Sequence, residues 1–216
     1  MSLKVLAYHQ VNNMGEDPLI VKTEMFLRQL DYLEDNGFKF IPPDMLISHS
    51  LPKERCVLLT FDHCFRSHYE VVFPLLKARG LPAVFFLTTD FIEREGMLTF
   101  EEIRFLVRSG FKMASHTLSH PYLTRIPLAQ AKKEIEDSKK ILEDRLGVAV
   151  DFFSYPYADL NEDIVALVKA SGYKAAFLTR PWWKPRSGPG GTEFTRPRCG
   201  IYHRTNFLFF QLKLLS

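Results

Sequence analysis

Short apolar runs alternate with longer amphipathic stretches along almost the whole chain, and no other feature of the sequence constrains the fold as much. Such runs are typical of buried parallel strands, and six are present, at residues 5–8, 56–61, 83–87, 112–115, 152–155 and 175–178. The amphipathic stretches between them predict helices at residues 23–36, 69–79, 99–109, 128–146 and 162–171. This repeated strand–helix order indicates an α/β barrel or a doubly wound sheet.

Glycine positions support these boundaries. Each predicted helix runs up to a glycine, which adopts the left-handed conformation that often ends a helix; these are Gly37, Gly80, Gly110, Gly147 and Gly172. The sequence contains neither an internal repeat nor a recognisable linker. We therefore expect residues 1–216 to form a single domain, because α/β barrels of about this length commonly fold as one domain.

Composition excludes several classes of function. The 28 basic and 25 acidic residues give a net charge of +3, which is too balanced to suggest nucleic-acid binding. No stretch approaches the ~18 apolar residues of a membrane span. Three cysteines, an odd number, argue against a disulfide framework. The apolar run near Met1 is too short for a signal peptide, so we expect a cytoplasmic protein; a signal removed earlier would leave the same sequence and an extracellular location.

Two histidines four residues apart, His116 and His120, suggest a metal site. On a helical turn, residues at this spacing share one face, so both rings would reach one cation. Neutral imidazole suits zinc, nickel, cobalt or iron. The pair alone is weak evidence, because the same spacing also occurs in histidines with a purely structural role.

Further polar residues follow the ends of predicted strands. Asp62 and His63 follow one strand, His116 follows another, and residues 155–157 follow a third. Functional residues of both barrels and doubly wound sheets lie at the carboxyl ends of strands, so these residues are expected on one rim. A barrel would bring His9, which follows the first strand, to the same rim.

Residues 181–197 contain four prolines, three glycines and both tryptophans, and are expected to form a long loop near this rim. Trp182 and Trp183 are candidates for stacking on a sugar, and Tyr155 and Pro156 are further candidates for substrate contact. An alternative role of the tryptophans is to attach the loop to the body of the protein.

Three motifs occur in order: Leu-Thr-Phe-Asp at 59–62, Ser-His-Thr-Leu-Ser-His-Pro at 115–121 and Phe-Ser-Tyr-Pro-Tyr at 153–157. Together they resemble the motifs of polysaccharide deacetylases, the NodB-homology group or carbohydrate esterase family 4. The opening Leu-Ala-Tyr-His-Gln-Val is similar to that of a circularly permuted branch that includes poly-N-acetylglucosamine deacetylases. The resemblance implies a distorted, incomplete (β/α) barrel and metal-dependent removal of acetyl groups from an N-acetylated sugar or polysaccharide.

The resemblance also implies a role for individual residues. Asp62 matches the catalytic base, and Arg198 matches an arginine that orients it. Tyr157 matches the residue whose backbone N–H helps to form the oxyanion hole, and His9 matches the general acid of the permuted branch. His116 and His120 match two ligands of one divalent metal, for which zinc is the first candidate and nickel, cobalt or iron are alternatives.

The chain departs from the family pattern at the third ligand, where His63 and Cys64 replace the usual aspartate and glycine. Three interpretations stay open. His63 could complete a three-histidine site, a known catalytic zinc arrangement. It could instead point away, leaving a degenerate deacetylase, or it could be native to a subgroup with another acyl substrate. Cys64 could strain its turn if that position needs a positive φ.

The leading hypothesis is a metal-dependent deacetylase whose partner is an N-acetylated carbohydrate. A non-catalytic saccharide-binding protein on the same fold and a hydrolase of another small amide are the alternatives. The sequence specifies neither the polymer, its linkage and chain length, nor the oligomeric state.

Overall fold

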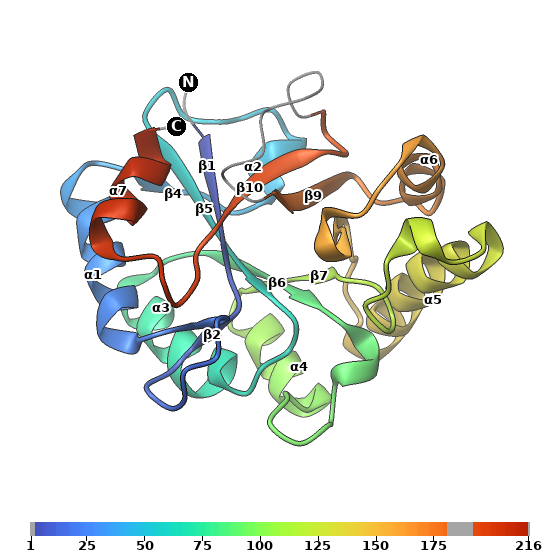
Figure 1. Cartoon of the computed structure of the whole chain (residues 1–216), viewed down its shortest axis with the longest axis horizontal. Coiled ribbons are helices and arrows are strands. Elements are labelled where there is room, and N and C mark those ends of the chain that lie inside the picture. Colours follow the sequence, from blue (N-terminus) through green and yellow to red (C-terminus); the bar gives the residue numbers. More distant parts are fainter. Residues whose placement is uncertain (1–2, 181–191, 216) are drawn as a thin grey trace.

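The computed structural model of the chain describes residues 3–180 and 192–215. Within these residues, seven parallel strands close into a barrel, in the order β1, β10, β9, β8, β7, β6, β5 around the ring (Figure 1). They are β1 (Leu3–Tyr8), β5 (Cys56–Asp62), β6 (Ala83–Leu87), β7 (Lys112–Ser115), β8 (Phe152–Ser154), β9 (Ala175–Arg180) and β10 (Arg196–Gly200). The ring closes because β1 pairs with both β5 and β10. A ring of seven strands is one strand short of the complete, eight-stranded (β/α) barrel, so the expected incomplete barrel is confirmed.

Shorter strands lie outside the ring. β4 (Lys39–Phe40) pairs with the first residues of β5. β2 (Gln10–Val11) and β3 (Ile20–Val21) form a separate parallel pair directly after β1. This small pair lies at the carboxyl end of β1 and therefore at the rim where the site is expected.

Helices surround the strands (Figure 1). They are α1 (Thr23–Asp35), α2 (Asp44–Ile47), α3 (Phe73–Arg79), α4 (Phe100–Arg108), α5 (Leu128–Leu146), α6 (Glu162–Ala170) and α7 (Phe207–Leu215). A π-helical turn, His68–Val72, leads into α3, and 3-10 turns occur at Thr89–Phe91, Leu123–Arg125 and Pro156–Ala158. Thr99 and Glu102 form a capping box at the start of α4, which fixes where that helix begins.

Alternating strand side chains separate the core into two clusters, because successive residues of a strand point to opposite faces. One cluster fills the inside of the barrel and includes Leu58, Phe86 and Phe177. Ile41 and Leu46, from the segment around β4 and α2, pack against it and close the amino-terminal end of the strands. Polar side chains lie at the carboxyl-terminal end of the strands.

The structure differs from the expected elements in two places. The stretch 69–79 begins as a π-helical turn and becomes α-helical only at Phe73. The loop predicted at 181–197 extends too far toward the C-terminus, because Arg196–Gly200 forms β10. Pro197 obscured this strand, since proline lacks the N–H that a strand normally donates. The apolar C-terminal segment is helix α7.

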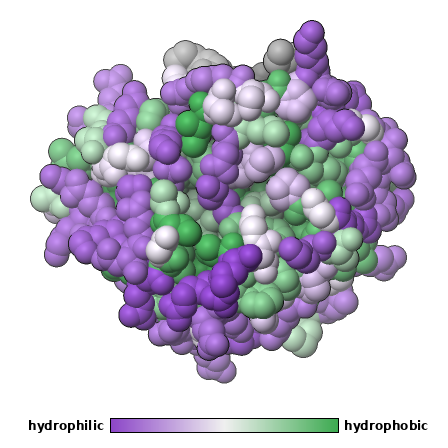
Figure 2. All heavy atoms as spheres, turned by 180° about the vertical axis from the view of Figure 1, so that it is seen from behind, coloured by the Kyte–Doolittle hydropathy of each residue, from purple (hydrophilic) through white to green (hydrophobic). Residues whose placement is uncertain are grey.

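The face opposite to that of Figure 1 is edged by hydrophilic side chains, with apolar ones visible near its centre (Figure 2). Four of the larger exposed apolar residues lie on α7, namely Leu208, Phe209, Leu212 and Leu215, and the others are spread over several elements. Among the described residues, every helix is too short or too polar to cross a bilayer.

Candidate active site

Three histidines from two strand ends meet at the carboxyl-terminal rim of the barrel. His63 directly follows β5, whereas His116 and His120 follow β7. One ring nitrogen from each lies within 4.8 Å of the others, and the Nε2 atoms of His116 and His120 are 3.1 Å apart. His63 and His116 are buried, and His120 is half-buried. This grouping has the size and the donor atoms of a site for one cation.

Hydrogen bonds at the outer ring nitrogens of His116 and His63 leave a lone pair on the inner nitrogen of each. Nδ1 of His116 lies 2.7 Å from the Ser154 carbonyl oxygen; a carbonyl only accepts, so Nδ1 carries the proton and Nε2 a lone pair. Nδ1 of His63 lies 3.3 Å from the Thr88 hydroxyl, which itself donates to the His116 carbonyl. The Nε2 atom of His63 is therefore the one available to a cation. Outer partners of this kind are usual for metal-binding histidines.

The imidazoles of this cluster are neutral at ordinary pH. Burial lowers the pKa of His116 to about 3 and that of His120 to about 4, in each case against the opposing effect of Asp62. Burial, aided by His116, also lowers the pKa of His63 well below its ordinary value. Neutral rings present lone pairs instead of protons, so the donor set fits a divalent metal.

A strained loop, and not the expected helical turn, brings His116 and His120 together. Thr117 (φ 66°) and His120 (φ 65°) both adopt the left-handed conformation, which is uncommon outside glycine. The Thr117 hydroxyl accepts a hydrogen bond from the His120 N–H at 3.0 Å. The prediction that both histidines share one face of a helical turn was therefore wrong, although the two rings do lie close together as expected.

Glu134 on α5 fixes this loop from outside. Its buried carboxylate accepts hydrogen bonds from the backbone N–H groups of Leu118 (3.0 Å) and Ser119 (2.9 Å) and from the Ser119 hydroxyl (2.6 Å). Glu134 was not identified from the sequence. The available signal was its spacing from Ala131 and Ser138, which places it on the buried face of the helix.

Asp62 and Arg198 form a buried, bidentate ion pair beside the histidines. The Nη1–Oδ1 and Nη2–Oδ2 distances are both 2.6 Å, and Arg198 also donates to the hydroxyls of Thr60 and Ser154. Burial raises the pKa of Asp62, but the Arg198 guanidinium outweighs this effect, so the pKa lies well below its usual range. The contact expected between Arg198 and the candidate base is present, and the carboxylate is ionised.

The ring of His9 lies between His63 and Tyr202, with centroid distances of 5.5 Å and 5.7 Å. The barrel thus brings His9 to the rim, as expected. Its Nδ1 atom is buried and has no hydrogen-bond partner among the described residues. Burial lowers the pKa of His9, and the charge of Asp62 opposes that shift. Tyr202, which follows β10, was not identified from the sequence.

His68 supports His9 from within the core. It begins the π-helical turn before α3. It is fully buried among the rings of Phe61, Phe65 and Phe85. Its Nε2 atom donates to the His9 carbonyl oxygen at 2.5 Å. His68 therefore fixes the backbone that carries the His9 ring.

The turn after β8 exposes one of its three candidate residues. Tyr155 and Pro156 are buried, and the Tyr155 hydroxyl donates to a backbone carbonyl, so their side chains form the wall of the turn and are not open to a substrate. Tyr157 has a φ of 56° and a side chain exposed to 56%. Its ring stacks on Tyr122 at 4.0 Å and lies 4.5 Å from the ring of His120.

Cys64 packs into the core and is not a candidate ligand. Its side chain is fully buried, and burial raises the pKa of the thiol to about 12. The left-handed conformation falls on His63 (φ 67°) and not on Cys64, so the strain expected at Cys64 is absent. Trp182 and Trp183 lie outside the described residues.

A seven-stranded parallel barrel with polar residues gathered at its carboxyl rim is the architecture of NodB-type deacetylases. The chain belongs to the polysaccharide deacetylase family, whose model matches residues 49–176. YxkH of Bacillus subtilis, a protein named for this family, is 30% identical over 183 residues, which cover 83% of this chain and 65% of YxkH.

Two further proteins extend the comparison. The poly-β-1,6-N-acetyl-D-glucosamine N-deacetylase of Staphylococcus aureus is 25% identical over 175 residues, which cover 73% of this chain and 60% of that enzyme. The chain thus spans less than two thirds of either relative. The structure of Streptococcus pyogenes deacetylase PplD in complex with acetate matches 99% of this chain and 98% of its own, with a TM-score of 0.85 and 22% identity. That likeness concerns the fold.

Proposed function

We propose that this chain is a metal-dependent hydrolase that removes acetyl groups from an N-acetylated sugar or polysaccharide. The observation that carries the proposal is the convergence of neutral imidazoles from His63, His116 and His120 beside the ionised, Arg198-bound carboxylate of Asp62. Membership of the polysaccharide deacetylase family supports the acetyl transfer to water. The name of the staphylococcal relative supports an N-acetylated substrate.

His63, His116 and His120 would hold one divalent cation, with zinc as the first candidate, because three imidazoles and an open position form a known catalytic zinc site. A cation bound there supplies Lewis acidity, which strengthens water as a nucleophile and polarises the acyl oxygen. A histidine in place of the family's usual aspartate gives this ligand set one negative charge fewer.

The residues around this cluster supply the proton transfers. Asp62 accepts the proton of the attacking water, and Arg198 fixes its orientation while each carboxylate oxygen keeps a further lone pair. His9 gives a proton to the leaving amine. Burial disfavours the protonated ring of His9 and the charge of Asp62 favours it, so proton uptake by His9 depends on an ionised Asp62. The backbone N–H of Tyr157 stabilises the acyl oxygen.

Acetate release from N-acetylglucosamine oligomers tests this function directly. Asp62→Asn should lower kcat at least ~10²-fold, the usual scale for a lost general base, while the fold persists. Elemental analysis of the wild type and of the His116→Ala/His120→Ala variant should show metal in the first and none in the second. Saccharide binding without acetate release would indicate the alternative of a non-catalytic saccharide-binding protein. Hydrolysis of other small amides alone would indicate the alternative of a hydrolase with another substrate.

A further inference from the structure

Thr88 follows β6, the strand that lies between the two strands carrying the clustered histidines (Figure 1). On one side β5 leads into His63, and on the other β7 leads into His116. The Thr88 side chain is fully buried, and the backbone beside it is fixed because the His116 N–H donates to the Leu87 carbonyl oxygen at 2.8 Å. Thr88 is therefore placed to act on ligands from both neighbouring strands.

The single hydroxyl of Thr88 contacts both of these histidines. Its Oγ1 atom lies 3.4 Å from the His116 carbonyl oxygen and 3.3 Å from Nδ1 of His63. A carbonyl only accepts, so the one hydroxyl proton points to His116, and the hydroxyl oxygen is left to accept from His63. Nδ1 of His63 is then the donor of the second hydrogen bond. The ring proton of His63 lies on Nδ1 and the lone pair on Nε2.

The other neighbours of the His63 ring do not decide where its proton lies. The rings of Phe65 and Phe91 are 5.5 Å and 5.9 Å from it, so they restrict how the imidazole lies but offer no oxygen to a ring N–H. In neutral imidazole either nitrogen carries the proton, and the partner of one nitrogen determines the state of the other. Without the Thr88 oxygen, the proton is free to move to Nε2, where it would block a cation.

This use of Thr88 depends on a histidine at position 63. An ionised aspartate there would only accept hydrogen bonds, so it would compete with the His116 carbonyl for the one hydroxyl proton. An aspartate also has no ring tautomer to fix. An accepting oxygen on Thr88 therefore serves the metal site only when residue 63 is a histidine.

We propose that Thr88 is a positioning residue of the metal site: its hydroxyl oxygen holds the ring proton of His63 on Nδ1, so that Nε2 keeps a lone pair for a cation. The inference rests on the proposed metal-dependent function of the rim. Outer partners of ligating histidines typically change metal affinity ~10–100-fold. The contact of 3.3 Å is long for a hydrogen bond, so we expect an effect near the lower end of this range.

A double-mutant cycle on zinc affinity tests the proposal. Thr88→Val keeps the shape of the side chain without the hydroxyl, and should weaken zinc binding about 10-fold in competition with a chromogenic chelator. In a His63→Asp background the same change should cost less than ~3-fold, because only the contact with His116 is lost. Thr88→Ser keeps the oxygen and should bind zinc as the wild type does. Equal losses in both backgrounds would overturn the inference, since Thr88 would then act without His63.

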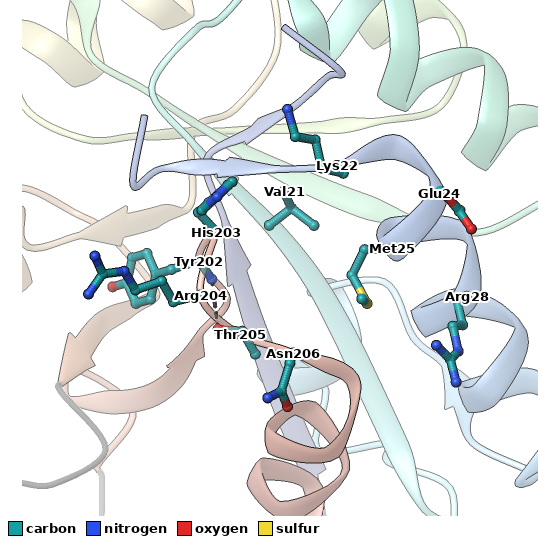
Figure 3. A pocket seen from close by; sticks show the side chains of 10 residues that line it. All are labelled: Val21, Lys22, Glu24, Met25, Arg28, Tyr202, His203, Arg204, Thr205 and Asn206. Atoms are coloured by element: carbon teal, nitrogen blue, oxygen red, sulfur yellow. Dashed lines mark hydrogen bonds between the residues drawn. The ribbon is translucent and has the colours of Figure 1, made fainter. Parts of the chain in front are cut away.

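Thr205→Val is the matched control. Thr205 lies in the turn between β10 and α7 (Figure 3), where its buried hydroxyl accepts a hydrogen bond from the Tyr202 N–H at 3.0 Å. The substitution removes a buried hydroxyl in the same way but leaves Thr88 and His63 as they are, so zinc affinity should stay at the wild-type value. A loss equal to that of Thr88→Val would overturn the inference, because any buried threonine would then have the same effect.

NMR of the histidine ring nitrogens gives a second readout that needs neither metal nor a folded variant at position 88. In the metal-free wild type we expect the His63 proton on Nδ1, and in Thr88→Val a measurable share on Nε2. A proton on Nε2 in the wild type would overturn the inference. A wild type that binds no zinc but keeps this proton on Nδ1 would overturn the proposed metal-dependent function and leave the contact between Thr88 and His63 intact.

Discussion

The phenol ring of Tyr202 lies directly over Gly200, leaving no room for a side chain. A Cβ atom on Gly200 would lie 2.5 Å from Cε2 and 2.6 Å from the hydroxyl oxygen of Tyr202. Gly200 does not have a positive φ, so space and not conformation requires a glycine here. Because the same ring stacks on His9, the missing side chain at the end of β10 allows Tyr202 to cover one face of that histidine.

Gly200→Ala should displace this ring and disturb His9. We expect kcat on an N-acetylated oligomer to fall by about 10²-fold, the effect of a displacement near 1 Å at a catalytic group. In a Tyr202→Leu background, Gly200→Ala should lower kcat little further, because the two residues act through one contact. Steady-state kinetics of the four proteins would check this, and an unchanged kcat in Gly200→Ala would refute it.

Arg198→Gln should shift the acid limb of the pH profile upward. Burial raises the pKa of Asp62 and Arg198 outweighs it, so removal of the guanidinium leaves the raising effect opposed only by His116 and His9. The working carboxylate exists above its pKa, and activity should then be lost at a higher pH as the solution is acidified. The profile of kcat/KM against pH measures the shift; Arg198→Lys, which keeps a charge, should shift less.

The same substitution should also destabilise the fold. Arg198→Gln leaves Asp62 as a buried, unpaired charge, and breaking such a pair typically costs about 3–5 kcal/mol. Urea unfolding at neutral pH would measure this cost. If Arg198→Gln were as stable as the wild type, the ion pair would contribute nothing to folding.

Glu134→Gln should weaken metal binding without touching a ligand. Its carboxylate accepts the Leu118 and Ser119 N–H groups, and loss of an outer support of this kind typically costs ~10–100-fold in metal affinity. Glu136→Gln on the same helix is the matched control, because its 3.7 Å pair with Lys132 is partly exposed and worth little. Competition with a chromogenic chelator gives the affinities; equal values in both variants would contradict the prediction.

His63→Ala should lower metal affinity by more than the ~10–100-fold effect of an outer partner, because it removes a direct ligand. His63→Asp restores the usual residue of the family and should keep the metal, with an altered preference among zinc, nickel and cobalt. Elemental analysis after dialysis against each metal would show both effects. Full retention in His63→Ala would mean that this imidazole does not coordinate.

Local patterns predicted most of the barrel. The bounds of β6, β7 and α5 match the sequence expectation, because buried runs and glycine stops are encoded within a few residues. β10 escaped notice because Pro197 conflicts with strand propensity in any local window. The loop carrying His116 and His120 could not be predicted as left-handed, since neither glycine nor asparagine marks it.

The site required information that no local pattern contains. Asp62 and Arg198 are 136 residues apart in sequence, and only the family resemblance suggested their contact. Glu134, His68 and Tyr202 act on other residues through tertiary contacts, so their own positions carry no motif. Packing of the closed barrel decides which of these side chains meet.

Among the residues that the structure describes, five non-glycine residues around the rim have positive φ angles: His63, Thr117, His120, Tyr157 and Ala158. Each such residue costs on the order of 1–3 kcal/mol, which the rest of the barrel offsets. Selection for heat resistance and selection for turnover should therefore oppose each other here. Glycine at Thr117 would relieve the backbone, yet it would also remove the hydroxyl that holds His120. A variant library screened only for melting temperature should accumulate inactive proteins at these positions.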